Sequence, residues 1–384
     1  MIFEKLKKTP FPIYLVLLCL VSCTSPKKES EQPEFNPEVF QSFQLSINSE
    51  RKKFASLIDS IELIPLEETN QSLLTSVSRV IKYDDQYLVI NKGDEEIVFF
   101  DSEGKYLKTF NRLGEGPREY QSINSFWVQD DLLSIYERKR TTIFNYTLDG
   151  NFVDSRKLPT QVGHVRKYGD EYVVEFGINA TGDSLFYKFG VLDENLVPKD
   201  LYLKTDDIST AVVWSKENSV IPYQDGLLLM RMNSDTTYFY KKGEFEPLIH
   251  FDFGEEWYWK NGAILKSEDY DLIETSGQAW DIITRMNDKF IYARAVVAFS
   301  GYEHFLIDRS TCEAVRMDLR KDAETELVPY NLGWEDDRWL ISMTPDDLLF
   351  LAEELGVDLP NTDQISQSEN PVLVKVKFKD SSAW

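Results

Sequence analysis

Residues 97–120 read IVFFDSEGKYLKTFNRLGEGPREY and contain the pattern that decides the fold. The apolar strand IVFF runs into a turn from Asp101 to Gly104, and the strand KYLKTF leaves in the opposite direction, which is the pattern of a β-hairpin. The plan recurs at 144–153, FNYTLDGNFV, where Gly150 lies 46 residues after Gly104. A fixed spacing of about 40 to 50 residues is typical of proteins built from repeated blades. The sequence therefore predicts successive antiparallel sheets of similar size.

The repeat can be followed along the chain, with four-stranded units predicted over 76–110, 123–158, 165–203, 220–253 and 280–319. A sixth unit is divided between the chain ends, because strands are predicted at 57–66, 336–343 and 371–379. Pro65 cannot donate a ladder hydrogen bond, so its strand is expected at an edge. A ring closed in this way leaves no open sheet edge between the first and last blades.

One helix is predicted inside the last unit. Thr344 supplies the N-cap, Pro345 the first helical position, and Asp346 and Asp347 the first-turn acids. The apolar face of LLFLAEEL then continues until Gly356. The predicted fold class is an all-β, six-bladed β-propeller. Its split last blade is closed by the N- and C-terminal strands and carries one short C-terminal helix insertion.

The N-terminus predicts export. Basic residues at 5, 7 and 8 precede the apolar run FPIYLVLLCL, which is too short to span a bilayer. The following residues end in Cys23 and resemble the lipobox of bacterial lipoproteins. We therefore expect a signal peptide at 1–22, a lipidated tether at 23–42 with the lipid on Cys23, and the propeller at 43–384. The expected location is the outer membrane, on its periplasmic or surface-exposed face, with the membrane contacted through the lipid.

Composition limits the partners and the chemistry. The 42 Lys and Arg against 65 Asp and Glu give a net charge of -23, which repels nucleic acid and anionic membrane surfaces. His164, His250 and His304 fall in three different predicted blades without metal-binding spacing, and therefore predict no metal site. Once Cys19 has left with the signal and Cys23 carries lipid, Cys312 remains. It is expected to be a buried or half-buried apolar side chain.

Several segments together resemble one known family. FDSEGK at 100–105 and GEGPREY at 114–120 are similar to the FDxxGK and GxGPGEY signatures of six-bladed β-propeller lipoproteins of Bacteroides-type bacteria, which are relatives of the NHL-repeat propellers. IELIPLEET at 61–69, SDTTY at 234–238 and the ending at 370–378 fit the same family. The resemblance covers about residues 57–380 and implies export, a lipid anchor and a six-bladed ring. The family's biochemical role is mostly undefined.

Arg118 stands where that family usually has Gly. If the position has a positive φ, Arg costs about 1–2 kcal/mol there or the loop differs. The surrounding GEGP segment could suggest a phosphate cradle, but it lies between two predicted strands and has no following helix. It is therefore interpreted as a turn between blades.

Aromatic residues are the main sequence evidence for a binding site. Trp257, Tyr258 and Trp259 lie together in a polar insertion outside the repeat, and Trp334 lies on the loop before the last blade. Exposed rings would suit a carbohydrate or the side chains of a peptide or envelope protein. The alternative is that they plug the ring or brace a blade. With Arg118, these residues form the predicted ligand-binding set of a non-catalytic binding platform.

An enzyme is the second hypothesis. Propeller enzymes of lactonase or lyase type hold a divalent cation with acidic residues around the channel, and Ca²⁺ is the expected ion under this alternative. The sequence shows no GxSxG, P-loop or DxDxDG motif, so the first hypothesis includes no catalytic residue, metal or cofactor.

Overall fold

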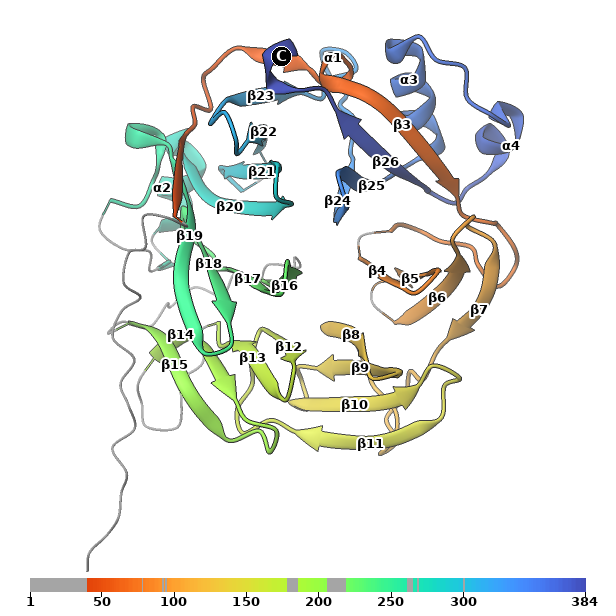
Figure 1. Cartoon of the computed structure of the whole chain (residues 1–384), viewed down its shortest axis with the longest axis vertical. Helices are drawn as coiled ribbons and strands as arrows, with labels where there is room; N and C mark the ends of the chain where they lie inside the picture. The colour runs from red at the N-terminus through yellow and green to blue at the C-terminus, as the bar shows by residue number, and fades with distance from the viewer. Residues whose placement is uncertain are drawn as a thin grey trace, which may run out of the picture.

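The computed structural model describes residues 40–77, 79–91, 93, 95–177, 186–205, 219–260, 265–267, 269–299 and 301–384. In these residues the strands form six sheets arranged as a ring, a six-bladed β-propeller (Figure 1). The predicted fold class is therefore confirmed. The predictions for the signal peptide, the lipid on Cys23 and most of the tether lie outside the described residues.

The first five blades follow each other in sequence. Blade 1 contains β4 (Val80–Tyr83), β5 (Gln86–Asn91), β6 (Glu96–Asp101) and β7 (Tyr106–Phe110). Blade 2 contains β8 (Ser125–Gln129), β9 (Leu132–Glu137), β10 (Thr142–Thr147) and β11 (Phe152–Lys157). Blade 3 contains β12 (His164–Tyr168), β13 (Glu171–Glu175), β14 (Phe186–Leu192) and β15 (Pro198–Thr205). Blade 4 contains β16 (Val220–Tyr223), β17 (Gly226–Met230), β18 (Thr236–Lys241) and β19 (Glu244–Asp252). Blade 5 contains β20 (Ala279–Met286), β21 (Phe290–Val297), β22 (Gly301–Asp308) and β23 (Ala314–Asp318).

Blade 6 joins the two ends of the chain. It contains β24 (Tyr330–Glu335), β25 (Arg338–Met343), β26 (Val372–Phe378) and β3 (Ile58–Pro65). β26 pairs antiparallel with β3, so that Val374 lies opposite Leu63. β3 is the last strand of this sheet, as expected from Pro65. The predicted closure is confirmed, whereas β24 was predicted as part of a loop.

The turn between β6 and β7 requires a glycine at position 104. Gly104 has φ +85°, and a Cβ atom there would lie 2.1 Å from the carbonyl oxygen of Pro65. The Asp101 carboxylate accepts hydrogen bonds from the backbone N–H groups of Glu103 and Lys105. The turn of blade 1 therefore lies directly against the end of the closing strand of blade 6.

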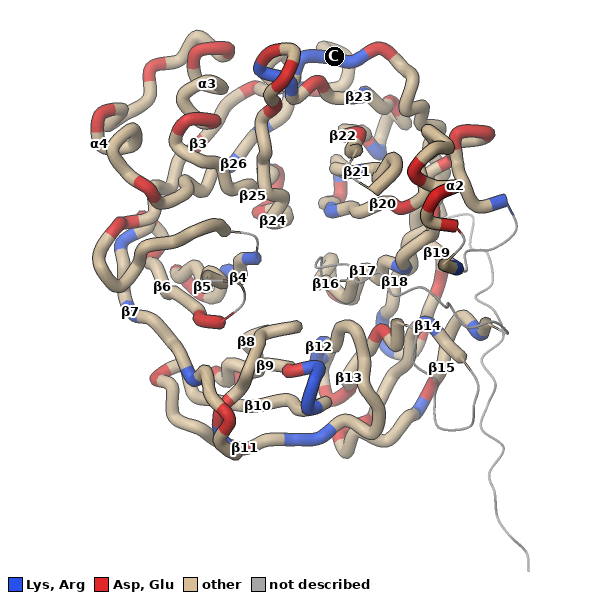
Figure 2. The backbone as a smooth tube through the Cα atoms, turned by 180° about the vertical axis from the view of Figure 1, so that it is seen from behind, with Lys and Arg blue, Asp and Glu red and all other residues tan. Residues whose placement is uncertain are grey.

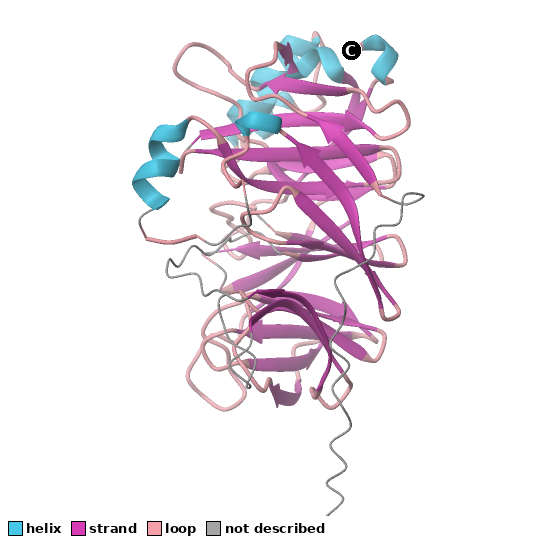
Figure 3. Ribbon diagram, turned by 90° about the vertical axis from the view of Figure 1, so that its left-hand side faces the viewer, coloured by secondary structure: helices cyan, strands magenta, loops and turns pink. Residues whose placement is uncertain are grey.

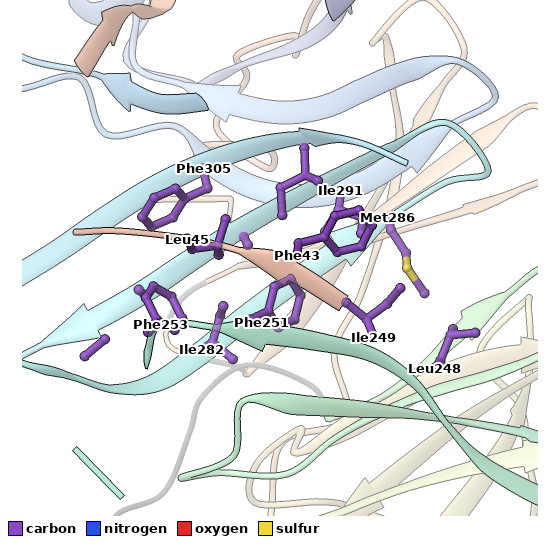
Figure 4. Packing of buried hydrophobic residues seen from close by; sticks show 14 of the residues in the cluster. Phe43, Leu45, Leu248, Ile249, Phe251, Phe253, Ile282, Met286, Ile291 and Phe305 are labelled. Carbon is purple, nitrogen blue, oxygen red and sulfur yellow. The ribbon is translucent and has the colours of Figure 1, made fainter. Parts of the chain in front are cut away.

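Apolar side chains fill the space between every pair of neighbouring blades. Six separate clusters of buried residues lie between blades 1 and 2, 2 and 3, 3 and 4, 4 and 5, 5 and 6, and 6 and 1. Figure 4 shows the cluster between blades 4 and 5, which includes Phe251 of β19, Ile291 of β21 and Phe305 of β22. Because each blade buries both faces, its strands are apolar without strict alternation.

An N-terminal strap, residues 41–65, crosses the outside of three blades (Figure 1). It begins with β1 (Gln41–Gln44), which pairs parallel with β19 of blade 4, and continues with β2 (Arg51–Lys53), which pairs parallel with β23 of blade 5. The short helix α1 (Phe54–Leu57) then leads into β3. The sequence did not predict β1 or β2, and β1 begins two residues before the predicted boundary at 43.

Glu256 ties the strap to blade 4. One carboxylate oxygen accepts hydrogen bonds from the Ser46 hydroxyl (3.0 Å) and the Asn48 amide (2.8 Å), and the other from the backbone N–H of Ile47 (2.7 Å). We expect Glu256→Ala to lower the free energy of unfolding by about 1–2 kcal/mol, because a partly buried charged acceptor is lost. Denaturant titration measures this change. Glu255→Ala, at the exposed neighbouring position, is the control and should change stability by only a few tenths; equal losses would contradict the prediction.

The helices lie outside the stacked sheets (Figure 3). α3 (Pro345–Leu355) has the predicted caps: the Thr344 side chain accepts from the Asp347 N–H, and Gly356 is left-handed. α4 (Thr362–Gln367) follows in the same insertion, and α2 (Asp269–Ser276) lies in the insertion between blades 4 and 5. Single turns of 3-10 helix lie at η1 (Gly254–Glu256) and η2 (Ser381–Ala383). The prediction of one helix was therefore incomplete.

One local prediction was wrong, and a condition stated for Arg118 is not met. Cys312 is exposed, with φ +62°, in the turn between β22 and β23, so the expectation of a buried or half-buried side chain was wrong. Arg118 does not have a positive φ, and so no backbone strain arises from the absence of Gly. A hairpin turn offers no neighbouring sheet to cover the side chain of Cys312.

Candidate functional site in the central channel

A cavity of about 340 Å³ lies at the centre of the ring. Its walls come mainly from the innermost strands β4, β8, β12, β16, β20 and β24, which surround the axis in Figure 1. Each of these lies at the inner end of the strand order in its sheet. The ring therefore brings together residues that are far apart in the sequence.

Four of the described residues that line this cavity are cations, and none is Asp or Glu. Arg79 and Lys82 come from blade 1, Arg166 from blade 3 and Arg285 from blade 5. Figure 2 shows the basic segments of β4, β12 and β20 around the centre of the ring. Because these are alternate blades, the positive charges approach the axis from three sides. The cavity is basic, although the chain has a net charge of -23.

Three of these cations are held by neighbouring groups. Arg79 donates to the carbonyl oxygens of Ile123 (2.7 Å) and Asn124 (3.0 Å). Arg285 is 9% exposed and donates to the carbonyl oxygen of its neighbour Thr284 (2.8 Å).

Lys82 forms an ion pair with Glu335 at 3.0 Å, and the hydrogen bond between the two raises the pKa of the lysine. Lys375 lies 3.1 Å from the same carboxylate. Two cations therefore share one anion at this side of the ring.

Arg166 differs from the other three. Its side chain, which is half-buried on β12 near the axis, makes no hydrogen bond or ion pair with any described residue. Burial lowers the pKa of its guanidinium to about 10, because the charged form loses hydration. An arginine without a compensating anion is unfavourable in such a place.

Trp334, one of the predicted binding residues, lines the same cavity. Its ring stacks on Phe290 with 6.1 Å between centroids, and its buried Nε1 has no hydrogen-bond partner among the described residues. Tyr223 and Met286 also contribute to the wall. The cavity thus combines positive charge with aromatic and apolar surface.

The other predicted aromatic residues lie elsewhere. Trp257 is 6% exposed and stacks on Phe253, with 5.7 Å between centroids, in the cluster between blades 4 and 5. Trp259 donates its Nε1–H to the carbonyl oxygen of Trp280 (2.7 Å), and its ring meets Tyr258 edge-on at 4.8 Å. The structure does not bring these three residues together with Trp334.

Arg118 lies in the turn between blades 1 and 2 and does not line the cavity. Its carbonyl oxygen accepts a hydrogen bond from the Tyr146 hydroxyl (2.9 Å), and its guanidinium lies 5.5 Å from the centre of the Phe152 ring. Arg140 donates to the carbonyl oxygens of Gly116 and Glu119 in the same turn. The interpretation of this segment as an inter-blade turn is confirmed.

The enzyme hypothesis expects carboxylates around the channel that hold a divalent cation. No group of three or more His, Cys, Asp or Glu side chains among the described residues is placed to hold a metal ion. His164 lies 2.9 Å from the Ser219 hydroxyl and His304 lies 2.8 Å from the Tyr292 hydroxyl, in different blades. The described cavity wall also lacks the carboxylates that Ca²⁺ prefers.

Sequence reasoning missed the cavity cations although a signal was present. Lys82, Arg166 and Arg285 each lie two to four residues before the acidic turn that ends the first strand of a blade. Basic residues in such apolar strands are unexpected in an acidic chain. The blade repeat then places these positions at a common axis.

The fold and cavity define a six-bladed β-propeller with a basic centre. The chain belongs to the family described as Domain of unknown function (DUF4934), whose model matches residues 42–377. No curated protein is similar enough to count as a relative. None of the described helices combines the length and apolar character needed to cross a membrane.

Two solved structures from Bacteroides have similar folds. A protein of Bacteroides fragilis NCTC 9343, which its name presumes to be exported, superimposes with a TM-score of 0.72 at 16% identity, covering 89% of this chain and 100% of the other. A member of the DUF4221 family from Bacteroides vulgatus ATCC 8482 gives a TM-score of 0.50 at 11% identity, covering 84% and 97%. At these identities the likeness is evidence for the fold.

Proposed function

We propose that this protein is a non-catalytic binding module of the cell envelope, whose central cavity binds part of a carbohydrate, a peptide or a protein partner. The observation that carries the proposal is the cavity itself, which is walled by side chains from all six blades. A concave site of about 340 Å³ that mixes apolar walls with a few polar groups is the usual form of a ligand site. The rigid ring holds these side chains in fixed positions.

The envelope location is supported by the N-terminal signal and the lipobox-like residues before Cys23. The Bacteroides fragilis protein of similar fold, with its presumed export, agrees with this location. In this proposal the lipid on Cys23 anchors the chain to the outer membrane, and the ring contacts the ligand.

A substitution that fills part of the cavity tests the proposal. Leu332 lines the cavity, and Leu332→Trp should fill part of it; Leu107→Trp makes the same change on the outer strand β7, where the side chain is 45% exposed. Thermal shift of the purified chain is measured with neutral and acidic disaccharides and with tripeptides. We expect a ligand that raises the Tm of the wild type and of Leu107→Trp but not of Leu332→Trp. Equal stabilisation of both variants would place binding outside the cavity.

A further inference from the structure

We propose that the ligand of the central cavity is a small organic anion, whose carboxylate, sulfate or phosphate group binds the guanidinium of Arg166 while its apolar or ring portion contacts the wall that includes Trp334. This inference rests on the proposed function and names the chemical class of its ligand. It was not evident in the sequence, because the residues concerned belong to different blades.

The side chain of Arg166 is the first evidence for a bound anion. Arginine keeps its proton under all ordinary conditions, so the half-buried Arg166 cannot avoid the loss of hydration by becoming neutral. The chain supplies no hydrogen-bond or ion-pair partner for it among the described residues. Its planar fork of N–H donors matches the oxygens of a carboxylate, sulfate or phosphate in a bidentate geometry. An oxyanion would supply the missing partner.

The other charged residues that line the cavity also favour a bound anion. Arg79, Lys82 and Arg285 line the same cavity, and no Asp or Glu is among its described lining residues. Within low-dielectric walls, charges of one sign reinforce each other and raise the local concentration of the opposite ion.

The size and the remaining wall define the rest of the ligand. A volume of about 340 Å³ is near the lower end for ligand sites, so the bound part is small. Ile81, Leu332 and Met286 give an apolar wall, and the rings of Tyr223 and Trp334 add flat surface. A long polyanion is disfavoured by the net charge of -23 on the whole chain.

Isothermal titration calorimetry of the purified full chain tests the inference with defined probes. These are a galacturonic acid disaccharide, N-acetylglucosamine 6-sulfate, glucose 6-phosphate and benzoate, with a neutral galactose disaccharide as the uncharged probe. The sugar acids and benzoate share an oxyanion but differ in origin, so they separate an acidic glycan from a free organic acid. We expect at least one anion to bind at millimolar concentration or below, and the neutral probe not to bind.

Arg166→Met is the decisive variant. It should weaken binding of that anion by about tenfold or more, because a charge-assisted hydrogen bond is lost. It should leave the Tm unchanged or higher, because a half-buried charge without a partner among the described residues is removed. Arg166→Lys should retain part of the affinity. Arg118→Met, at the inter-blade turn, removes the same charge outside the cavity and should change neither quantity.

The outcomes separate this inference from the proposed function. If a neutral probe binds and Leu332→Trp abolishes its binding, the function stands and the anion assignment fails. If an anion binds equally well to Arg166→Met, the assignment of Arg166 fails. If no anionic probe binds at millimolar concentration, the inference is overturned.

Discussion

Asn370→Ala is expected to lower the free energy of unfolding by about 4 kcal/mol, although the residue is one side chain in a ring of six blades. Asn370 is 1% exposed and connects segments nearly 300 positions apart. Its Oδ1 accepts from the N–H of Leu74 (2.8 Å), and its Nδ2 donates to the carbonyl oxygens of Ser72 (2.8 Å) and Leu66 (3.3 Å). Alanine would leave these buried groups without partners, each at a cost of about 1–3 kcal/mol. Chemical denaturation measures the loss.

Asn195→Ala is the matched control, since Asn195 lies exposed in the turn between β14 and β15. It should change stability by only a few tenths of a kcal/mol. If Asn370→Ala is as stable as this control, the pairing of β26 with β3 and the apolar cluster between blades 6 and 1 must hold the ring closed without the side-chain contacts.

Trp257→Ala is expected to cost about 4 kcal/mol as well, because a large buried ring leaves a cavity that the surrounding residues refill only in part. The ring lies against Phe253 in the cluster that also contains Phe43 of the strap and Phe305 of blade 5. The loss should therefore appear as a lower Tm of the whole domain, with no effect on ligand binding beyond that caused by unfolding.

Leu272→Ala provides the control within the same insertion, on α2, where the side chain is 56% exposed. It should leave the Tm nearly unchanged. An unchanged Tm for Trp257→Ala together with lost ligand binding would instead support the recognition role predicted from sequence and contradict the placement of this ring in the core.

Most of the fold could be predicted because each blade repeats the same local rules. The turn glycines Gly104 and Gly150 both have positive φ, and their spacing gave the repeat length correctly. The apolar strands between them indicated burial on both faces, which the packed blades provide. Thr344 and Gly356 predicted the ends of α3, since helix caps are determined by local chemistry.

The missed elements depend on tertiary contacts. β1 and β2 have only four and three residues, too few to show a period, and they are strands because the open edges of β19 and β23 offer hydrogen bonds. β24 contains Gly333 and a register shift between Asn331 and Gly333, which interrupt its alternation. Neither the pairing of β1 and β2 with other blades nor the irregular strand β24 can be predicted from neighbouring residues alone.

Of the residues that line the candidate site, only Trp334 was among those predicted from the sequence, and the cavity as a whole was not predicted. Adjacent aromatic residues in 257–259 appeared to be the stronger signal, but their position in the insertion lets them pack between blades and against Trp280. Arg166 and Arg285 lie 119 positions apart in the sequence. Their association follows from the ring, which converts one position per blade into a common wall.

The contrast between the acidic chain and its basic centre has a kinetic consequence. At long range the net charge of -23 repels an approaching anion and slows its encounter, whereas inside the cavity the force changes sign. Salt screens both forces over about 8 Å at physiological ionic strength. Added salt therefore speeds entry as well as escape. The time an anion spends inside, rather than the frequency with which it arrives, then determines which anions the ring retains.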